Sequence, residues 1–213
     1  MTDTYVYKYG DALYINLTNR CTNDCIFCVR RGGNFGEYNL FLRSGAEPSA
    51  KDVIKQLKSH NFKKAREVVF CGYGEPTYNL DVMLEVAKFL MGKVRVRLNT
   101  NGLANVIHGF DTTDKIAEVI KHINVSLNAP NAARYNEVSK PDYEKLKYTN
   151  WKGEIIQVEN AFDEVLKFIY LCKRRLVYLT LSVVGDVLTK DEIDLCRLAA
   201  KDIGANFRLR GSM

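Results

Sequence analysis

Two kinds of apolar segment alternate along the chain: short β-prone runs, and longer amphipathic runs with helical spacing. The β-prone runs are Ala12–Thr18, Glu67–Phe70, Val94–Asn99, Ile123–Asn128, Leu176–Val184 and Asn206–Leu209. Apolar residues at helical spacing predict helices over Leu80–Met91, Thr113–Ile120 and Phe162–Leu171. Two further helices are predicted by the capping-box spacing of Ser49 with Asp52 and of Thr189 with Glu192.

Six strands separated by helices predict an α/β fold made of parallel β/α units. Six such units form a partial (β/α)6 barrel, roughly three quarters of the eight-unit barrel. A doubly wound open sheet has the same alternation, and the pattern does not distinguish the two. In both architectures ligands bind where strands end at their carboxyl edge. We expect a single domain over 1–213, because no repeat or low-complexity linker interrupts the chain.

Two stretches break the alternation of strands and helices. Arg30–Pro48 is rich in glycine and aromatic residues, and Asn131–Asn160 mixes polar residues with tyrosines and a tryptophan. Long connections in compact domains commonly serve as lids or binding loops. The stretch 30–48 is therefore expected to act as a lid or as a docking loop.

The composition of the 213-residue chain, with 46% hydrophobic and 26% charged residues, is that of an ordinary globular protein. Its net charge of +6 is scattered, which favours solubility and gives no dense basic run that would indicate nucleic-acid binding. The first residues, MTDTYVYKYGD, contain no apolar signal region, and no stretch approaches the ~18 apolar residues of a membrane span. We expect a cytoplasmic protein without a membrane partner.

Three of the six cysteines, Cys21, Cys25 and Cys28, crowd into a C-x3-C-x2-C run directly after the first predicted strand. Three close thiolates can hold three corners of an iron–sulfur cubane and leave the fourth iron open. A structural zinc site would need a fourth ligand, and His60, His108 and His122 show no ligand spacing. The remaining cysteines, Cys71, Cys172 and Cys196, are expected to be small core residues.

This run, with Phe27 as the aromatic residue before the third cysteine, resembles the cluster motif of the radical SAM superfamily. The resemblance implies a partial (β/α)6 barrel and a [4Fe–4S] cluster held by the three cysteines of the loop 19–30. It also implies that the open iron binds S-adenosylmethionine (SAM) through its amino nitrogen and carboxylate. The amino-acid sequence of this loop is most similar to that of a branch of the superfamily associated with TatD-type hydrolases.

Further positions match the family's SAM-binding segments. Gly72, Gly74, Glu75 and Pro76 resemble the Gly-Gly-Glu-Pro motif, with a tyrosine between the two glycines. Glycines allow close approach of a ligand to the backbone, and the carboxylate can accept hydrogen bonds from the SAM ammonium group. Alone, such a segment is equally typical of a simple turn.

Polar residues on three later strands are candidates for the same ligand. The resemblance implies that Asn99 and Thr100 lie near the SAM carboxylate or ribose. Ser126 and Asn128 share one face of the fourth predicted strand, and Ser182 lies on the fifth, where it is expected to line the adenosine pocket. If these faces point outward instead, the residues are only solvated.

The resemblance implies an oxygen-sensitive enzyme that cleaves SAM reductively to a 5′-deoxyadenosyl radical, with an electron donor resembling flavodoxin or ferredoxin. A small-molecule substrate is favoured over a partner protein, because no added peptide-recognition domain is evident. An activating enzyme for a partner protein, a non-catalytic electron carrier and a SAM-binding protein without cleavage remain as alternatives. Arginines that point into the barrel would favour an acidic substrate, and the alternating arginines of the third and sixth strands are Arg95, Arg97, Arg208 and Arg210.

Overall fold

The computed structural model describes residues 3–32, 38–43, 45, 47–150 and 152–211. Its strands are β1 (Val6–Tyr9), β2 (Ala12–Ile15), β3 (Val68–Phe70), β4 (Val96–Thr100), β5 (His122–Ser126), β6 (Lys147–Thr149), β7 (Ile155–Gln157), β8 (Tyr178–Val184) and β9 (Asn206–Arg210). Its α-helices are α1 (Ala50–Ser59), α2 (Leu80–Leu90), α3 (Ala104–His108), α4 (Thr113–Val119), α5 (Ala132–Ser139), α6 (Ala161–Arg174) and α7 (Lys190–Ile203).

The order of the strands identifies the architecture. Seven strands form one sheet in the order β1-β2-β3-β4-β5-β8-β9, and every pair from β2 to β9 is parallel. A doubly wound sheet reverses its strand order at a switch point, whereas these six parallel strands follow one another in sequence. The predicted partial (β/α)6 barrel is therefore confirmed, and the doubly wound alternative is excluded.

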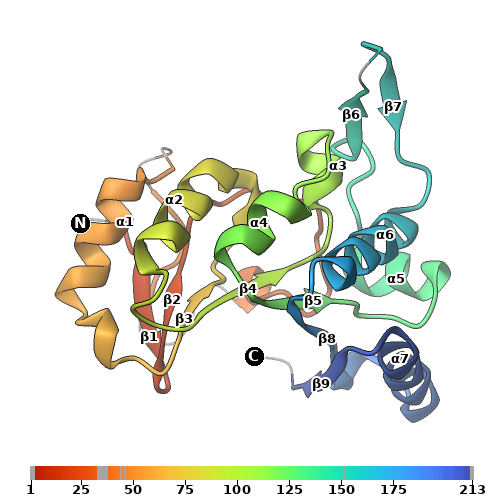
Figure 1. Ribbon diagram of the computed structural model, residues 1–213. Helices are drawn as coiled ribbons and strands as arrows, with labels where there is room; N and C mark the ends of the chain where they lie inside the picture. The colour runs from red at the N-terminus through yellow and green to blue at the C-terminus, as the bar shows by residue number, and fades with distance from the viewer. Residues whose placement is uncertain (1–2, 33–37, 44, 46, 151, 212–213) are drawn as a thin grey trace.

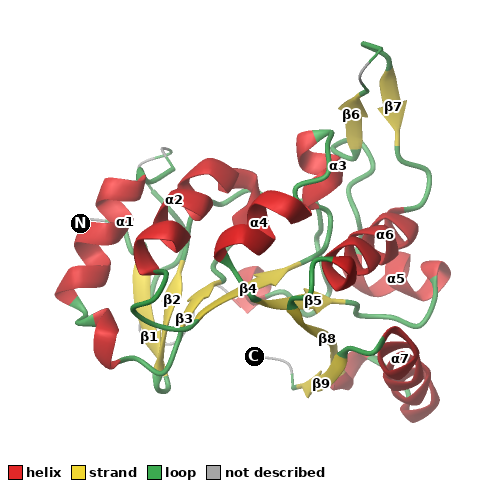
Figure 2. Ribbon diagram, viewed as in Figure 1, coloured by secondary structure: helices red, strands yellow, loops and turns green. Residues whose placement is uncertain are grey.

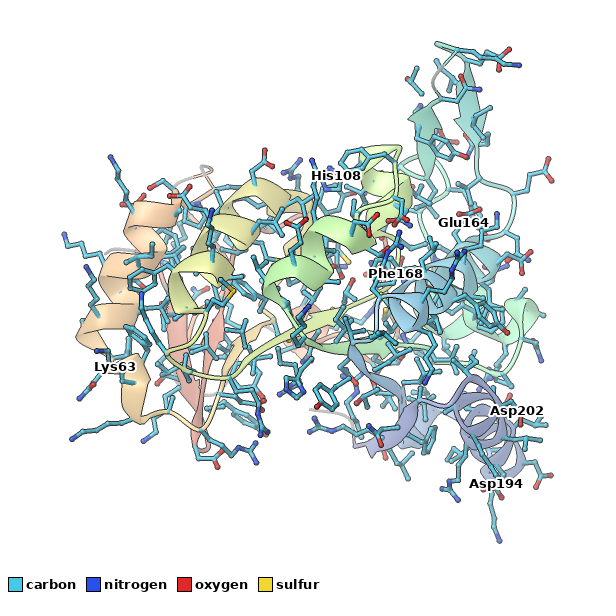
Figure 3. All side chains as sticks on the ribbon, in the orientation of Figure 1. Lys63, His108, Glu164, Phe168, Asp194 and Asp202 are labelled. Atoms are coloured by element: carbon cyan, nitrogen blue, oxygen red, sulfur yellow. The ribbon has the colours of Figure 1, made fainter. Side chains whose placement is uncertain are left out.

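The helices of the crossovers pack on one side of the curved row of strands (Figure 1, Figure 2). Their apolar stripes form a continuous core with the outward-facing side chains of the strands. Figure 3 illustrates the two sides of these helices. Phe168 of α6 is fully buried, whereas Asp194 and Asp202 lie on the exposed side of α7.

Local sequence signals fixed several helix boundaries. Both predicted capping boxes form, with the Ser49 side chain accepting from the Asp52 amide and the Thr189 side chain from the Glu192 amide. The predicted strands and helices appear within a few residues of their expected bounds. The strand predicted to reach Asn128 ends at Ser126, because Asn128 adopts a left-handed conformation with φ of 61°.

Several elements were not anticipated. Strand β1 adds an antiparallel edge to the sheet, so that the sheet has seven strands and not six. The stretch 131–160 contains helix α5 and the hairpin of β6 and β7, which projects from the body at the upper right of Figure 1. Within the described residues, every helix is too short or too polar to cross a lipid bilayer.

The stretch 30–48 is attached to the end of β2 by two asparagines. Asn16 Nδ2 donates to the carbonyl of Leu40 at 2.6 Å, and the amide of Asn19 exchanges two hydrogen bonds with the backbone of Leu42. Leu40 and Leu42 are buried. Residues 33–37, 44 and 46 lie outside the described residues, so the expected lid or docking role stays a prediction.

Candidate active site

A pocket of about 540 Å³ lies at the carboxyl edge of the parallel strands, where the fold predicts a site. It gathers side chains from loops and strand ends that are far apart in the sequence. Most of the residues predicted from the sequence line it: Cys21, Cys25, Phe27, Cys28, Gly72, Gly74, Glu75, Pro76, Asn99, Thr100, Ser126 and Asn128.

The loop that carries the cysteines is held by helix α5 and by Lys140, the residue directly after it. Asp24 and Ile26 donate backbone hydrogen bonds to the carbonyls of Lys140 and Val138, at 3.0 Å each. The Asn23 side chain also donates to the hydroxyl of buried Tyr135 at 3.0 Å. The unanticipated helix α5 therefore positions the cysteine loop.

The three cysteines of the loop are free thiols that influence one another electrostatically. Burial, together with Glu75, raises the pKa of Cys21 to about 11, and burial with its two neighbouring cysteines raises the pKa of Cys25 to about 12. Metal binding would have to displace these protons. Among the described residues, no group of three His, Cys, Asp or Glu side chains is already arranged around a metal position.

Arg30 donates a hydrogen bond to a cysteine sulfur of the loop. Arg30 Nε donates to Cys28 Sγ at 3.3 Å, and its Nη2 donates to the Asn23 carbonyl at 2.5 Å. A cationic donor to a thiolate stabilises the negative charge that a metal-bound cysteine carries.

The two glycines after β3 allow close contact with the segment that leads into the cysteine loop. A Cβ on Gly72 would lie 2.6 Å from the Asn16 Cα, and one on Gly74 would lie 2.3 Å from the Arg20 carbonyl oxygen. Approach to a ligand is the expected reason for glycines here, but in the structure they approach the protein's own backbone. They thereby hold the second strand end against the cysteine loop.

Glu75 is buried and accepts four hydrogen bonds. The Thr77 amide and hydroxyl and the Thr100 hydroxyl donate to Oε1, at 3.3, 2.8 and 2.8 Å, and the Asn101 amide donates to Oε2 at 2.8 Å. Burial raises the pKa of this carboxyl, and these donors oppose the shift. The carboxylate thus joins the ends of β3 and β4.

The end of β5 presents amide oxygens to the pocket. Asn124 and Asn128 are buried and line it, and the Oδ1 atom of each has no hydrogen-bond partner among the described residues. Ser182 is fully buried and is not among the lining residues, but it contacts one of them, because Asn124 Nδ2 donates to its hydroxyl at 3.1 Å. Buried acceptors without donors point to a ligand that supplies them.

The arginines of the two alternating pairs differ in environment. Arg97 Nη2 donates to Glu67 Oε1 at 2.9 Å, and its Nη1 donates to Asn99 at 2.5 Å, so this arginine is neutralised within the protein. Arg95 is exposed before β4. Arg208 and Arg210 line the pocket.

Sequence reasoning missed Asn101, Asn124 and Arg30 as site residues. Asn124 stands two residues before Ser126 and belongs to the same alternation, which was a sufficient signal. Asn101 Nδ2 donates to Thr22 at 2.8 Å and so connects β4 to the cysteine loop. That contact depends on tertiary structure and has no local signature.

The family model of the radical SAM superfamily matches residues 15–199. The chain belongs to the radical SAM superfamily. Members of this family use a [4Fe–4S] cluster and SAM. The more specific likeness to the branch associated with TatD-type hydrolases stays a prediction.

Several curated relatives are RNA methyltransferases. The chain is 27% identical to the probable dual-specificity RNA methyltransferase RlmN of Caldicellulosiruptor saccharolyticus over 166 residues, 74% of this chain and 42% of the relative. It is 28% identical to the dual-specificity RNA methyltransferase RlmN of Halorhodospira halophila over 129 residues, 55% of this chain and 32% of the relative. The chain spans less than half of these relatives.

Solved structures share the fold at low identity. Streptococcus suis SuiB bound to precursor peptide SuiA has a TM-score of 0.68 at 15% identity, covering 98% of this chain and 40% of SuiB. TYW1 with a lysine-pyruvate adduct has a TM-score of 0.59 at 16% identity, covering 95% of this chain and 65% of TYW1. SuiB with bound SAM has a TM-score of 0.63 at 15% identity, covering 94% of this chain and 40% of SuiB.

The residues of the pocket fit the two groups that the family uses. Three free thiols on one loop supply the soft ligands that iron–sulfur clusters require. The unpartnered oxygens of Asn124 and Asn128 can accept hydrogen bonds from the amino and hydroxyl groups of SAM. Both sets line one pocket, so cluster and SAM can be neighbours.

Proposed function

We propose that the chain is a radical SAM enzyme that holds a [4Fe–4S] cluster through Cys21, Cys25 and Cys28. The observation that carries this proposal is that these three thiols share one pocket with Glu75 and with the unpartnered asparagine oxygens of β5. When bound, the reduced cluster supplies the electron that splits SAM into methionine and a 5′-deoxyadenosyl radical, which takes a hydrogen atom from the substrate. A flavodoxin-like or ferredoxin-like protein is the proposed electron donor.

The chain's own residues bind and orient in this proposal. The three cysteines would hold three irons of the cluster and leave the fourth without a protein ligand, as reactive metal sites require. Asn124 and Asn128 would accept hydrogen bonds from SAM, and Ser126, Asn99 and Thr100 border the same space. Ser182 would act through Asn124, whose amide it orients. Phe27, packed against the core, would keep water from the cysteine loop.

A small-molecule substrate suits the site best. A volume of about 540 Å³ lies within the range of small-ligand pockets, and part of it would be taken by SAM. A macromolecular substrate is the second candidate, since the named relatives include RNA methyltransferases and a SuiB structure bound to a precursor peptide. Under this reading the projecting β6–β7 hairpin is the natural contact surface (Figure 1).

Anaerobic reconstitution with iron and sulfide tests the proposal. The protein should bind about four irons, show the absorption of a [4Fe–4S] cluster, and form 5′-deoxyadenosine from SAM once dithionite is added. Cys25→Ala should lose both cluster and product, whereas Cys172→Ala, a buried cysteine of α6 away from the pocket, should keep both. An active Cys25→Ala protein would refute the assignment. Oxygen exposure should bleach the cluster.

A further inference from the structure

Two arginines of the last strand, β9, line the same pocket as the cysteine loop, although they lie at the other end of the sequence. Arg208 and Arg210 both line the pocket, and they stand two residues apart on β9, so their side chains share one face of that strand. The parallel pairing of β9 with β8 sets Arg208 opposite Ser182 and Arg210 opposite Val184. Both guanidiniums therefore belong to the carboxyl edge of the barrel.

Neither arginine is neutralised by a carboxylate of the described residues. Arg210 Nη2 makes one long contact, 3.5 Å from the Ser126 hydroxyl, and its buried Nε has no hydrogen-bond partner there. Burial and the nearby charge of Arg208 both lower the pKa of Arg210, although Cys71 and Cys25 oppose the shift. The other half-buried arginines of the described residues each face a carboxylate, as in Arg97–Glu67, Arg134–Glu192 and Arg175–Asp114.

The described lining residues of the pocket offer these arginines no free carboxylate. Glu75 is the one carboxylate among its described lining residues, and its two oxygens are already engaged by Thr77, Thr100 and Asn101. A partly buried cation without a counter-charge is costly, and a protein that keeps one usually meets its counter-charge in a ligand. The planar guanidinium matches the paired oxygens of carboxylate and phosphate groups.

We propose that Arg208 and Arg210 form an anion subsite that binds a carboxylate or phosphate group of a small-molecule substrate. The inference rests on the proposed function, because it places the substrate beside SAM in the same pocket. SAM has one carboxylate, and the open iron is expected to hold it. The arginines on β9 are therefore left for a second anionic group, and they fix the class of the substrate.

The subsite can be tested by titration without turnover. The reconstituted, oxidised holoprotein, saturated with SAM, is titrated with malonate and with inorganic phosphate in a calorimeter. We expect binding of at least one of these anions, weakened by added chloride. Arg210→Gln should weaken it about tenfold or more, the loss expected for a charge-assisted pair. The anion affinity of Arg210→Lys should lie between those of the wild type and Arg210→Gln, because lysine keeps the charge but not the paired geometry of the guanidinium.

Controls separate this reading from simpler ones. Arg208→Gln alters an exposed side chain and should weaken anion binding severalfold even if Arg210→Gln fails to fold. Arg66 lies at the opposite end of the strands and pairs with Asp11, so Arg66→Gln should leave anion binding unchanged. SAM affinity and the cluster spectrum should be unaltered in Arg210→Gln.

Three results would overturn the inference: no anion binding by wild type, binding unchanged in both Arg208→Gln and Arg210→Gln, or a parallel loss of SAM affinity. The last would assign the arginines to the carboxylate of SAM itself. A wild-type protein that makes 5′-deoxyadenosine but binds neither probe defeats the subsite alone. A protein that assembles no cluster defeats the proposed function instead, and that result is read from iron content and absorbance before any titration.

Discussion

Arg30 Nε donates a hydrogen bond to Cys28 Sγ over 3.3 Å, and its Nη2 donates to the Asn23 carbonyl over 2.5 Å. The guanidinium is thereby clamped across the loop that would hold the cluster. Adding an electron increases the negative charge on the sulfurs of a cluster, so a cationic donor stabilises the reduced state more than the oxidised one. The contact is expected to raise the reduction potential.

Arg30→Gln should therefore make the bound cluster harder to reduce, with a midpoint potential lower by on the order of 50 mV, close to a tenfold change in a one-electron equilibrium. A redox titration followed by electron paramagnetic resonance measures the shift. Arg31→Gln is the matched control, since Arg31 contacts the Cys25 carbonyl and the Asp24 carboxylate but no sulfur. Equal potentials in the wild type and Arg30→Gln would contradict the role.

Gly74 allows the end of β3 to touch the segment before the cysteine loop. A Cβ there would lie 2.3 Å from the Arg20 carbonyl oxygen and 2.6 Å from that of Thr18. These are backbone atoms, and moving them to relieve the clash costs free energy. Gly74→Ala should therefore destabilise the protein by about 2–4 kcal/mol and reduce cluster loading.

Thermal unfolding and iron content measure the two effects of this substitution. Gly211→Ala is the control, because a Cβ at Gly211 meets no atom within 4 Å. It should leave the melting temperature unchanged. A Gly74→Ala protein as stable and as fully loaded as wild type would show that the two segments need not touch.

The ion pair of Glu67 with Arg97 predicts a pH dependence of stability. Burial alone would raise the pKa of Glu67, but the hydrogen bond and charge of Arg97, with Arg66 and Arg95, lower it overall. A carboxyl whose pKa is lowered in the folded state stabilises the fold above its unfolded pKa of about 4.3, and loses this contribution as the pH falls through the folded value. The wild-type melting temperature should therefore decline below about pH 4.3.

Glu67→Gln removes this dependence and leaves Arg97 without its counter-charge. At pH 7 it should cost about 2–3 kcal/mol, and the difference from wild type should shrink as the pH falls below 4. Denaturant unfolding at several pH values measures this difference in the free energy of unfolding. Glu164→Gln, which breaks the exposed pair with Lys167 on α6 (Glu164 is labelled in Figure 3), should cost less than about 0.5 kcal/mol. Parallel stability curves for wild type and Glu67→Gln would refute the expectation.

The sequence predicted those elements of the fold that depend on local interactions. Ser49 and Thr189 cap their helices as predicted, because a capping box involves only residues three apart. Strand β1 and helix α5 were missed, since β1 is defined by its pairing with β2 and α5 has a weak apolar stripe. Tertiary contact, and not local preference, determines both elements.

The same distinction applies to the site. The spacing of the cysteines predicted a cluster held by all three, and in the structure the three line one pocket. The alternation of arginines on β9 did not reveal which way they point, because period two gives two faces but not which of them is inside. Likewise Ser182 was a reasonable candidate by alternation, yet the pocket is lined by Asn124 of the neighbouring strand, which donates a hydrogen bond to Ser182.

This arrangement of Asn124 and Ser182 gives a final prediction about SAM. Asn124 Oδ1 is buried without a partner among the described residues, while its Nδ2 is fixed by Ser182. If the oxygen accepts a hydrogen bond from SAM, Asn124→Ala should weaken SAM binding about tenfold, the value of one hydrogen bond to a buried group.

Ser182→Ala provides the matched comparison for Asn124→Ala. It removes the partner of Nδ2 but leaves the amide oxygen in place, so SAM affinity should fall only about twofold to threefold. Calorimetric titration of SAM into the oxidised holoproteins distinguishes the two variants, and unchanged iron content excludes loss of the cluster. A larger loss in Ser182→Ala than in Asn124→Ala would mean that the serine contacts SAM directly, because only then would its hydroxyl matter more than the amide oxygen of Asn124.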